Sequence, residues 1–199
     1  MNGLWAILVP YLIGSIPFGY LLVKLTTGKD VRAEGSGNIG ATNVLRTTGK
    51  VVAVATLLLD IGKGYGAVWV ASTLGSGGPT WTSVAALAVM AGHAFPVFLK
   101  FQGGKAVASF IGAFLYVTPL PLVAVLVVFV ITAAVTHHIS AGSIMAAGTF
   151  PLAVWLIEHP SPVVMYVSII AGVFIVCRHK PNLERLHSGT EHVFRWRTG

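Results

Sequence analysis

The feature that most constrains this chain is a series of apolar stretches of the kind that cross a lipid bilayer. A transmembrane helix needs roughly 20 predominantly apolar residues. Only 10% of the residues are charged, whereas about 25% are charged in an ordinary soluble domain. We therefore predict an all-α integral membrane protein with seven transmembrane helices, the fourth of them short. The predicted spans are residues 4–23, 51–74, 80–99, 106–118, 120–137, 142–157 and 162–177.

The basic residues fall on one side of this arrangement. If the first residue lies outside the cell, every Lys and Arg except Lys63 lies on the cytoplasmic side. Because basic loops are retained in the cytoplasm, we predict an outer N-terminus and a cytoplasmic C-terminus. A five-span alternative with a re-entrant 106–118 fits this distribution less well. The basic segments lie around 24–50, 100–105 and 178–197, and the turns without Lys or Arg are 75–80, 118–120 and 158–161.

No linker, repeat or low-complexity stretch divides the chain, so residues 1–199 are expected to form a single polytopic membrane domain. The first apolar run lacks the basic start and the cleavage site of a secretory signal, and we expect it to remain as a membrane span. The single Cys177 excludes an internal disulfide and a multi-cysteine metal site. Cysteine is among the residues most often buried, so Cys177 is expected to be packed in the interior.

A glycine- and asparagine-rich loop follows the first span. It reads Gly35-Ser36-Gly37-Asn38-Ile39-Gly40-Ala41-Thr42-Asn43 and leads to Arg46. Small residues leave backbone N–H groups accessible, and a nearby cation adds positive charge, so the loop is suited to phosphate. It fits G-x-G-x-x-G, but no strand pattern surrounds it, which argues against a dinucleotide fold. An ordinary flexible loop is the alternative.

A second segment of this kind, Phe101-Gln102-Gly103-Gly104-Lys105-Ala106, precedes the fourth span. Because the apolar run begins at Ala106, we expect the two glycines at a helix N-terminus, where N–H groups and the helix dipole favour negative charge. The segment is not a nucleotide-binding P-loop, since it lacks the required glycine spacing and has Ala106 in place of Ser or Thr. A simple break between two spans is the alternative.

Several polar residues lie within the predicted spans. Asp60 and Lys63 are three residues apart on one helix face, and a structural ion pair is expected. A proton or ion pathway, which would favour a transporter, is the alternative. His93 is expected to be a buried, hydrogen-bonded histidine. Adjacent side chains on a helix cannot easily share one metal ion, so no zinc site is predicted at His137-His138.

The last span delivers His179 to the cytoplasmic boundary, within Arg178-His179-Lys180-Pro181-Asn182. An imidazole and an amide three residues apart can point into one pocket. His179 is suited either to act as a general base or to hydrogen-bond an acceptor hydroxyl. A basic surface tail is the alternative.

Taken together, these motifs resemble those of the PlsY family, the bacterial acyl-phosphate:glycerol-3-phosphate acyltransferases. They occur in the family's order and cover nearly the whole chain. The matching residues are Gly14-Ser15-Ile16-Pro17-Phe18-Gly19, Gly35 to Asn43 with Arg46, Gly92-His93-Ala94-Phe95-Pro96-Val97-Phe98, Gly103-Gly104-Lys105, His179-Lys180-Pro181-Asn182, Arg185-Leu186 and Gly189-Thr190-Glu191.

The resemblance implies transfer of a fatty acyl group from acyl phosphate to glycerol 3-phosphate, giving lysophosphatidic acid and phosphate. This would be the first acylation step of bacterial phospholipid synthesis, at the cytoplasmic face of the inner membrane. We expect a monomer whose partners are these small molecules and the membrane lipids, with no metal, cofactor or nucleic acid.

The resemblance also implies roles for particular residues. Lys180 stands where the family typically has arginine or a similar residue, and it keeps the positive charge without the planar guanidinium. Catalytic roles fall on Ser36, Arg46, Lys105, His179 and Asn182; substrate-binding roles fall on Gly37, Asn38, Thr42, Asn43, Gly103, Gly104 and Ser143; and Glu191 supports the structure.

An acyl phosphate is already activated, so the reaction requires no covalent enzyme nucleophile. The chain has no G-x-S-x-G nucleophile elbow. We expect direct attack by the glycerol hydroxyl, whose proton goes either to His179 or to a substrate phosphate. Two other classes are considered: a transporter of organic phosphate, with its groups near the bilayer centre, and a non-catalytic assembly subunit. Clustering of the loops on one face favours the enzyme.

Overall fold

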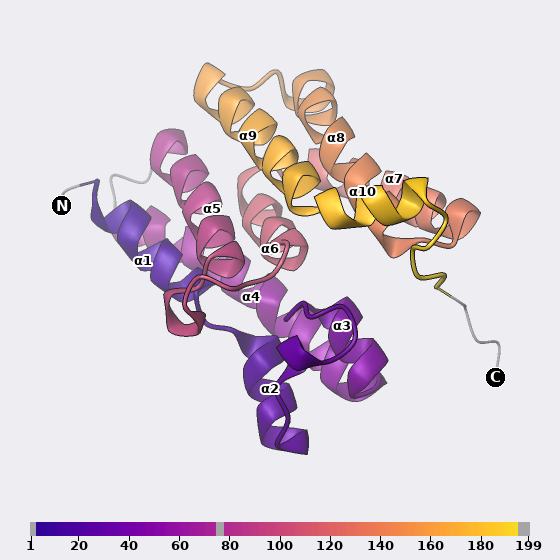
Figure 1. Ribbon diagram of the computed structural model, residues 1–199. Helices are drawn as coiled ribbons and strands as arrows, with labels where there is room; N and C mark the ends of the chain where they lie inside the picture. Colours follow the sequence, from indigo (N-terminus) through magenta and orange to yellow (C-terminus); the bar gives the residue numbers. More distant parts are fainter. Residues whose placement is uncertain (1–2, 75–77, 195–199) are drawn as a thin grey trace. The chain divides into compact units, whose positions relative to one another are not determined.

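The structure, a computed structural model, describes residues 3–74 and 78–194 (Figure 1). All regular elements in this part of the chain are helical, which confirms the predicted all-α class. Residues 75–77 of the predicted turn at 75–80 lie outside the described residues, as do Arg195 and Arg197. The chain divides into two compact units, Met1–Val117 and Thr118–Gly199.

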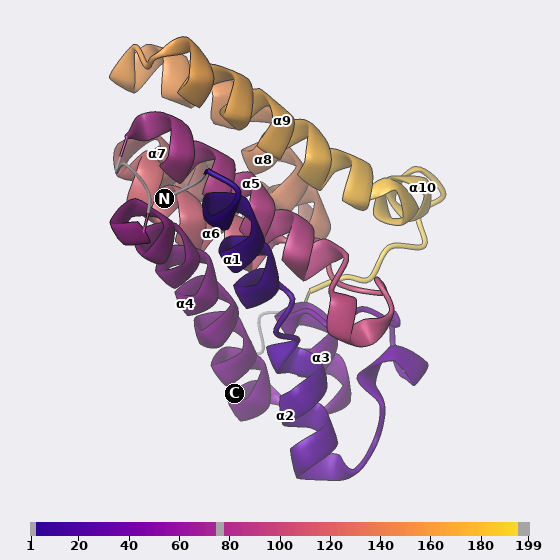
Figure 2. The same cartoon turned by 90° about the vertical axis from the view of Figure 1, so that its left-hand side faces the viewer.

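The first unit is built around the long helix α4. Helices α1, α5 and α6 pack against α4, and α1 also packs along α5 (Figures 1 and 2). The shorter helices α2 and α3 pack near the beginning of α4. The elements are α1 (Trp5–Gly14), α2 (Phe18–Thr27), the 3₁₀ helix η1 (Val31–Ala33), α3 (Ala41–Thr47), α4 (Lys50–Leu74), α5 (Pro79–Ala94), the 3₁₀ helix η2 (Val97–Leu99) and α6 (Val107–Val117).

The second unit is a row of three helices with a short helix at its end. Helix α8 packs against both α7 and α9, and α10 follows α9 after a bend of 56°. Proline occupies the first turn of α7, α9 and α10, where its missing N–H has no helical partner to lose. The elements are α7 (Pro119–Thr136), α8 (Ile139–Glu158), α9 (Pro162–Arg178) and α10 (Lys180–His187).

Each of the seven predicted spans coincides with helical structure, but not all are long enough to cross a bilayer. Within the described residues, five helical segments meet the length and hydropathy expected of a membrane span, with Trp5–Thr27 and Pro79–Leu99 each counted as one segment. The number is six if the bent pair α9–α10 counts as one span. Helix α6 has only 11 residues. The integral membrane class is therefore supported, whereas the count of seven and the orientation stay predictions.

Two predicted spans are interrupted by proline. The segment 4–23 was predicted as one helix, but it breaks between Gly14 and Phe18, and α2 then continues to Thr27. Pro17 lies at this break and cannot donate a helical hydrogen bond. The third predicted span, 80–99, ends as an α-helix at Ala94, before Pro96, and finishes in a 3₁₀ turn. Gly19, just after the first break, packs on Ile39 of the first candidate loop, and Pro96 at the second break packs on Gly103 of the second.

The prediction that Cys177 is packed in the interior is wrong. Its side chain is exposed on α9, as are those of Ile169, Ile170 and Val173 on the same helix. On a membrane-spanning helix, apolar side chains can face lipid at no cost. Burial frequencies taken from soluble proteins therefore do not predict the position of this cysteine.

Glycines allow α4 and α6 to approach closely. A Cβ atom added at Gly64 would lie closer than 3.0 Å to the Ser109 carbonyl oxygen, and one at Gly112 would likewise lie closer than 3.0 Å to the Ile61 carbonyl oxygen. The contact is reciprocal, since each glycine faces the backbone of the other helix. Small residues at such crossings let helix backbones touch, and dispersion contacts between them stabilise helix pairs in lipid.

We expect Gly112→Ala to lower the free energy of unfolding by about 1–3 kcal/mol, since the added methyl group forces the two backbones apart. Gly66→Ala on α4 is the matched control, because no atom lies within 4 Å of a Cβ placed there. The measurement is the thermal unfolding of both variants in the same detergent. Equal unfolding midpoints for the two variants would contradict the close-approach interpretation.

Candidate active site

The residues predicted to act on substrate fall into two sets, one in each unit. The first set comprises the loop from Gly35 to Arg46 and the segment from Gly103 to Lys105, both in Met1–Val117. The second comprises Ser143, His179, Asn182 and Glu191, all in Thr118–Gly199.

Asn43 holds the first loop together from within. Its side chain is buried and makes four hydrogen bonds. The amide oxygen accepts from the Ser36 N–H at 2.8 Å. The amide nitrogen donates to the carbonyl oxygens of Val31, Glu34 and Asn38 at 2.9–3.2 Å. These bonds engage the amide with the loop itself, and the prediction that Asn43 contacts substrate stays a prediction.

The other polar residues of this loop lie closer to its surface. Ser36, Gly37 and Arg46 are exposed, whereas Asn38 and Thr42 are half-buried. The Asn38 side chain accepts a hydrogen bond from the Gly40 N–H at 2.8 Å, just before α3 begins. Arg46 lies three residues after Asn43, which places it on the same side of α3. The Asn43 bond to Ser36 thereby connects the serine to the helix that carries the arginine.

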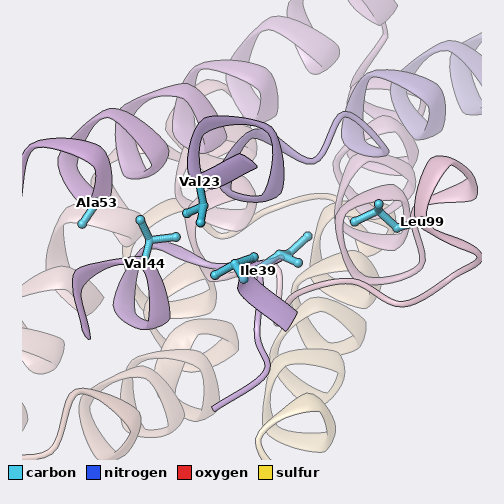
Figure 3. Packing of buried hydrophobic residues seen from close by; sticks show 6 residues of the cluster. Val23, Ile39, Val44, Ala53 and Leu99 are labelled. Atoms are coloured by element: carbon cyan, nitrogen blue, oxygen red, sulfur yellow. The ribbon is translucent and has the colours of Figure 1, made fainter. Parts of the chain in front are cut away.

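A small hydrophobic cluster joins the first loop to the second (Figure 3). Leu99, just before the second loop, packs in the same buried cluster as Ile39 and Val44 of the first loop. Residues of α2, η1 and α4 complete it. The two glycine-containing segments, some 60 residues apart in sequence, therefore lie on one common core. The members are Val23, Val31, Ile39, Val44, Ala53 and Leu99.

The second loop differs from the helix N-terminus that was predicted. Helix α6 begins at Val107, one residue later than expected. Ala106 has a left-handed φ of 63°, and its carbonyl oxygen accepts from the Phe110 N–H at 2.8 Å. The Gly104 N–H donates to the His93 carbonyl oxygen at 3.1 Å. This N–H is therefore already bonded to the protein.

Close packing explains why the second loop has two glycines. A Cβ at Gly103 would collide with the His93 carbonyl oxygen and with Pro96, and a Cβ at Gly104 would collide with the His93 ring. Lys105, which follows, is half-buried. The glycines thus allow the segment to pack closely against the end of α5, immediately before Lys105.

The backbone around this loop is strained. Lys100, Phe101 and Ala106 all adopt positive φ values, of 52°, 63° and 63°. Non-glycine residues rarely occupy this region, and such conformations concentrate at functional sites, where the surrounding structure holds them.

In the second unit, His179 is buried at the junction of α9 and α10. Its Nδ1 atom lies 2.8 Å from the Ile175 carbonyl oxygen. A carbonyl can only accept, so Nδ1 carries the proton in this bond. In the neutral ring Nε2 is then the acceptor nitrogen, which is the form needed to receive a proton from a hydroxyl.

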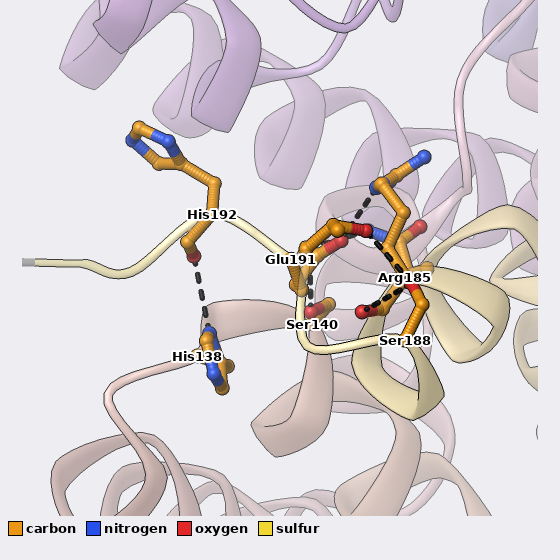
Figure 4. A network of polar contacts seen from close by, with 8 residues as sticks. His138, Ser140, Arg185, Ser188, Glu191 and His192 are labelled. Atoms are coloured by element: carbon orange, nitrogen blue, oxygen red, sulfur yellow. Dashed lines mark hydrogen bonds and ion pairs between the residues drawn. The ribbon is translucent and has the colours of Figure 1, made fainter.

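Glu191 is the centre of a polar network in this unit (Figure 4). Its Oε1 atom accepts from Ser140 at 2.8 Å and from Asn182 at 2.7 Å. Its Oε2 atom accepts from the Arg185 guanidinium at 2.7 Å. The network attaches the chain after α10 to both α8 and α10, and it fixes the orientation of the buried Asn182 amide.

The carboxyl group of Glu191 is held ionised by this network. Burial, the largest single influence, acts to raise its pKa, but the hydrogen bonds from Asn182, Ser140 and Arg185 together lower the pKa below its ordinary 4.5. A carboxylate with a lowered pKa stabilises the folded state above its ordinary pKa, and this contribution disappears as the pH falls through and below that value.

We therefore expect the thermal unfolding midpoint of the protein to fall between about pH 5 and about pH 3, as Glu191 takes up a proton. Glu191→Gln removes this titration, so its midpoint should depend less on pH over that range and be lower than that of the parent at neutral pH. The measurement is unfolding in detergent at a series of pH values. Parallel curves for parent and variant would contradict the assigned role of Glu191.

Ser143 has no distinctive geometry in the structure. Its hydroxyl donates to the Ile139 carbonyl oxygen of its own helix at 3.0 Å, and the side chain is buried. Its predicted contact with the acyl acceptor stays a prediction.

Sequence reasoning did not find the part played by Ser140 in the Glu191 network. The two residues are 51 positions apart, and no local spacing connects them.

The predicted ion pair of Asp60 and Lys63 is confirmed, with 2.7 Å between the charged atoms. Among residues 3–74 and 78–194, no group of three or more His, Cys, Asp or Glu side chains is arranged to hold a metal ion.

By fold, the protein is an all-helical integral membrane protein. Residues 4–189 match the family model described as glycerol-3-phosphate acyltransferase. The glycerol-3-phosphate acyltransferase of Geobacter sulfurreducens is 44% identical over 98% of this chain and 99% of its own. That of Trichlorobacter lovleyi is 46% identical, with 97% and 98% covered.

Solved structures agree with this match. The crystal structure of PlsY in its glycerol 3-phosphate form is similar with a TM-score of 0.89 and 36% identity, covering 97% of this chain and 96% of that one. The lysophosphatidic acid form gives a TM-score of 0.87 and 34% identity, covering 97% and 95%. The chain belongs to the glycerol-3-phosphate acyltransferase family of the PlsY type. The resemblance predicted from the sequence motifs is thus confirmed.

Proposed function

We propose that this protein transfers a fatty acyl group from acyl phosphate to glycerol 3-phosphate, giving lysophosphatidic acid and phosphate. The observation that carries the proposal is family membership over residues 4–189, together with the likeness to PlsY in forms named for glycerol 3-phosphate and lysophosphatidic acid. Membership in a family of enzymes also argues against the transporter and the assembly subunit.

Arg46 and Lys105 supply the charge that phosphorylated substrates require. Both substrates carry phosphate groups, and charge-assisted hydrogen bonds from Arg and Lys are the strongest contacts available to them. Ser36 and Gly37 are exposed on the same loop as Arg46, and Asn38 and Thr42 lie beside them. The internal bonds of Asn43 favour a role in shaping this loop rather than in contacting phosphate. Gly103 and Gly104 similarly shape the approach to Lys105.

His179 and Asn182 act on the acyl acceptor. The oxygen of a glycerol hydroxyl attacks the acyl carbon, the bond between that carbon and the phosphate oxygen breaks, and phosphate leaves with the bonding electron pair. The hydroxyl proton passes to Nε2 of His179 or to a substrate phosphate. Ser143 assists in positioning the acceptor, and Glu191 fixes Asn182. No covalent acyl-enzyme forms, because the acyl phosphate is already an activated donor.

The protein works as a single-domain monomer in the bacterial inner membrane. The proposed arrangement has seven transmembrane helices, an outer N-terminus and a cytoplasmic C-terminus. The distribution of Lys and Arg supports this orientation. Both phosphorylated substrates then enter from the cytoplasm, while the fatty chain lies among the spans in the bilayer.

The direct test is to incubate the purified protein with acyl phosphate and glycerol 3-phosphate and to detect lysophosphatidic acid by mass spectrometry. We expect product in proportion to time and enzyme, with release of one phosphate per acyl chain transferred. Acyl phosphate without glycerol 3-phosphate is the control for hydrolysis. Absence of lysophosphatidic acid from a folded preparation would reject the proposal.

A further inference from the structure

A cluster of three buried ionisable side chains lies inside the first unit. Asp60 and Lys63 of α4 are 2% and 6% exposed, and His93 at the end of α5 is 3% exposed. The Lys63 ammonium lies 2.7 Å from Oδ1 of Asp60. The same carboxylate oxygen lies 3.7 Å from Nδ1 of His93. We call these three residues the Asp60–Lys63–His93 cluster.

One side of the cluster holds the break in the first helix. The Lys63 ammonium donates to the carbonyl oxygen of Ile16 at 2.7 Å, between α1 and α2. It also lies 5.6 Å from the ring centroid of Phe18, the first residue of α2. The next residue, Gly19, faces the Ile39 carbonyl oxygen so closely that a Cβ would collide with it. Lys63 therefore fixes the start of the helix against which the first loop packs.

The other side of the cluster holds the second loop. The His93 carbonyl oxygen accepts the Gly104 N–H, and the His93 ring occupies the space that a Cβ at Gly104 would need. The His93 ring therefore packs directly on Gly104, the residue before Lys105. The first candidate phosphate-binding segment thus contacts α2, whose start is held by Lys63, and the second contacts His93 itself.

Joining helices through a buried ion pair carries a large desolvation cost. Removing two charges from water costs several kcal/mol per ion, and a well-packed apolar pair of similar volume often stabilises a protein as well or better. In lipid the penalty for an unpaired charge is larger still. The presence of the pair is therefore better explained by the particular backbone atoms that it holds than by general stability.

We propose that Asp60, Lys63 and His93 are positioning residues that set the mutual arrangement of the Ser36–Arg46 and Gly103–Lys105 segments. The cluster does not contact substrate itself. It acts through the Ile16 carbonyl on one side and through Gly104 on the other. The catalytic consequence rests on the proposed acyl transfer, whereas the ordering of the loop does not.

The test measures the loop directly. Gln102 is exposed beside Gly103, so a spin label on Gln102→Cys, in a Cys177→Ser background, reports the mobility of the segment. The double variant Asp60→Asn/Lys63→Met removes both charges with little change in volume and leaves no unpaired ion. We expect its label to be clearly more mobile than that of the parent, with an unfolding midpoint close to the parent value.

A second pair of variants covers the case in which the double variant does not fold. His93→Ala removes the ring that packs on Gly104, and we expect a mobile label. His93→Asn keeps a polar group at the position of Nδ1, and we expect it to restore part of the order. Ser83→Ala, a change at another buried polar residue of α5, is the matched control and should leave the label unchanged.

Kinetics separate positioning from plain loss of folded protein. Fewer folded molecules would lower kcat at constant KM. We expect instead a raised KM for glycerol 3-phosphate or acyl phosphate and a fall in kcat/KM of about tenfold to 100-fold, the range that a misplacement near 1 Å produces. A label as ordered as in the parent, in the double variant or in His93→Ala, would overturn the inference. An inactive parent would overturn only the proposed function, since the label still reports on the loop.

Discussion

Replacing Lys105 with alanine is expected to lower kcat/KM for acyl transfer about 100- to 1,000-fold. Charge accumulates on the departing phosphate as the acyl–oxygen bond breaks, and a fixed ammonium stabilises that charge more in the transition state than in the bound substrate. Lys105 is half-buried and follows two glycines packed against α5, so its backbone is held in place before substrate arrives. The measurement is initial-rate kinetics with both substrates varied.

Lys100 supplies the matched control for this experiment. It lies five residues earlier in the same segment and is exposed, and it belongs to neither predicted set. We expect Lys100→Ala to retain the parent kcat/KM within about twofold. Lys105→Arg keeps the charge but changes its geometry, and it should recover part of the activity. Equal losses for Lys100→Ala and Lys105→Ala would mean that only the general positive charge of the segment matters.

His179→Ala is expected to lower kcat/KM about 100-fold, because the change removes a buried ring whose Nδ1 proton is bound to Ile175. The pH dependence distinguishes its two roles. If Nε2 accepts the proton, the parent rate falls as histidine becomes protonated, and the variant loses this part of the profile. If the ring only positions the acceptor, the two profiles have the same shape.

His179→Gln provides the conservative comparison. A glutamine amide can hydrogen-bond a hydroxyl but cannot take its proton at neutral pH. Recovery of most activity in this variant would favour positioning and would point to a substrate phosphate as the proton acceptor. Activity as low as in His179→Ala would favour a general base.

Combining Lys105→Ala with His179→Ala tests whether the two predicted sets serve one reaction. Residues that act together as one unit in the transition state give strongly non-additive effects. We expect the double variant to lose much less activity than the product of the two single losses. Losses that multiply would indicate that the two residues lower the reaction barrier independently of one another.

The general class of the fold and the candidate loops were predictable because their signals are local. An apolar segment of sufficient length forms a helix in lipid wherever it occurs, since every backbone group must be hydrogen-bonded internally. The pairing of Asp60 with Lys63 followed equally from helix geometry, because residues three apart share a face. The motifs around Ser36, Gly103 and His179 were sufficient to indicate the family.

Other features depend on contacts between distant residues, and the sequence did not reveal them. The glycines before Lys105 were interpreted as an open helix terminus, yet Gly104 is bonded to His93 and Ala106 takes a left-handed conformation. The hydrogen bonds by which the Asn43 side chain holds its own loop were likewise not predicted, while its contact with substrate stays a prediction. Residue type alone does not distinguish a group that binds a ligand from one that holds the binding loop.

By itself, the sequence determined which segments are apolar enough to form membrane helices, which segments carry positive charge and which family motifs it contains. Tertiary structure decided how those segments are held. Leu99 packs in one hydrophobic cluster with residues of the first loop. Glu191 accepts hydrogen bonds from α8 and α10, and Lys63 donates one to the Ile16 carbonyl oxygen at the helix break. The physical reason is that hydropathy and helix periodicity act over neighbouring residues. Hydrogen bonds and close packing, in contrast, join atoms whose positions in the sequence are unrelated.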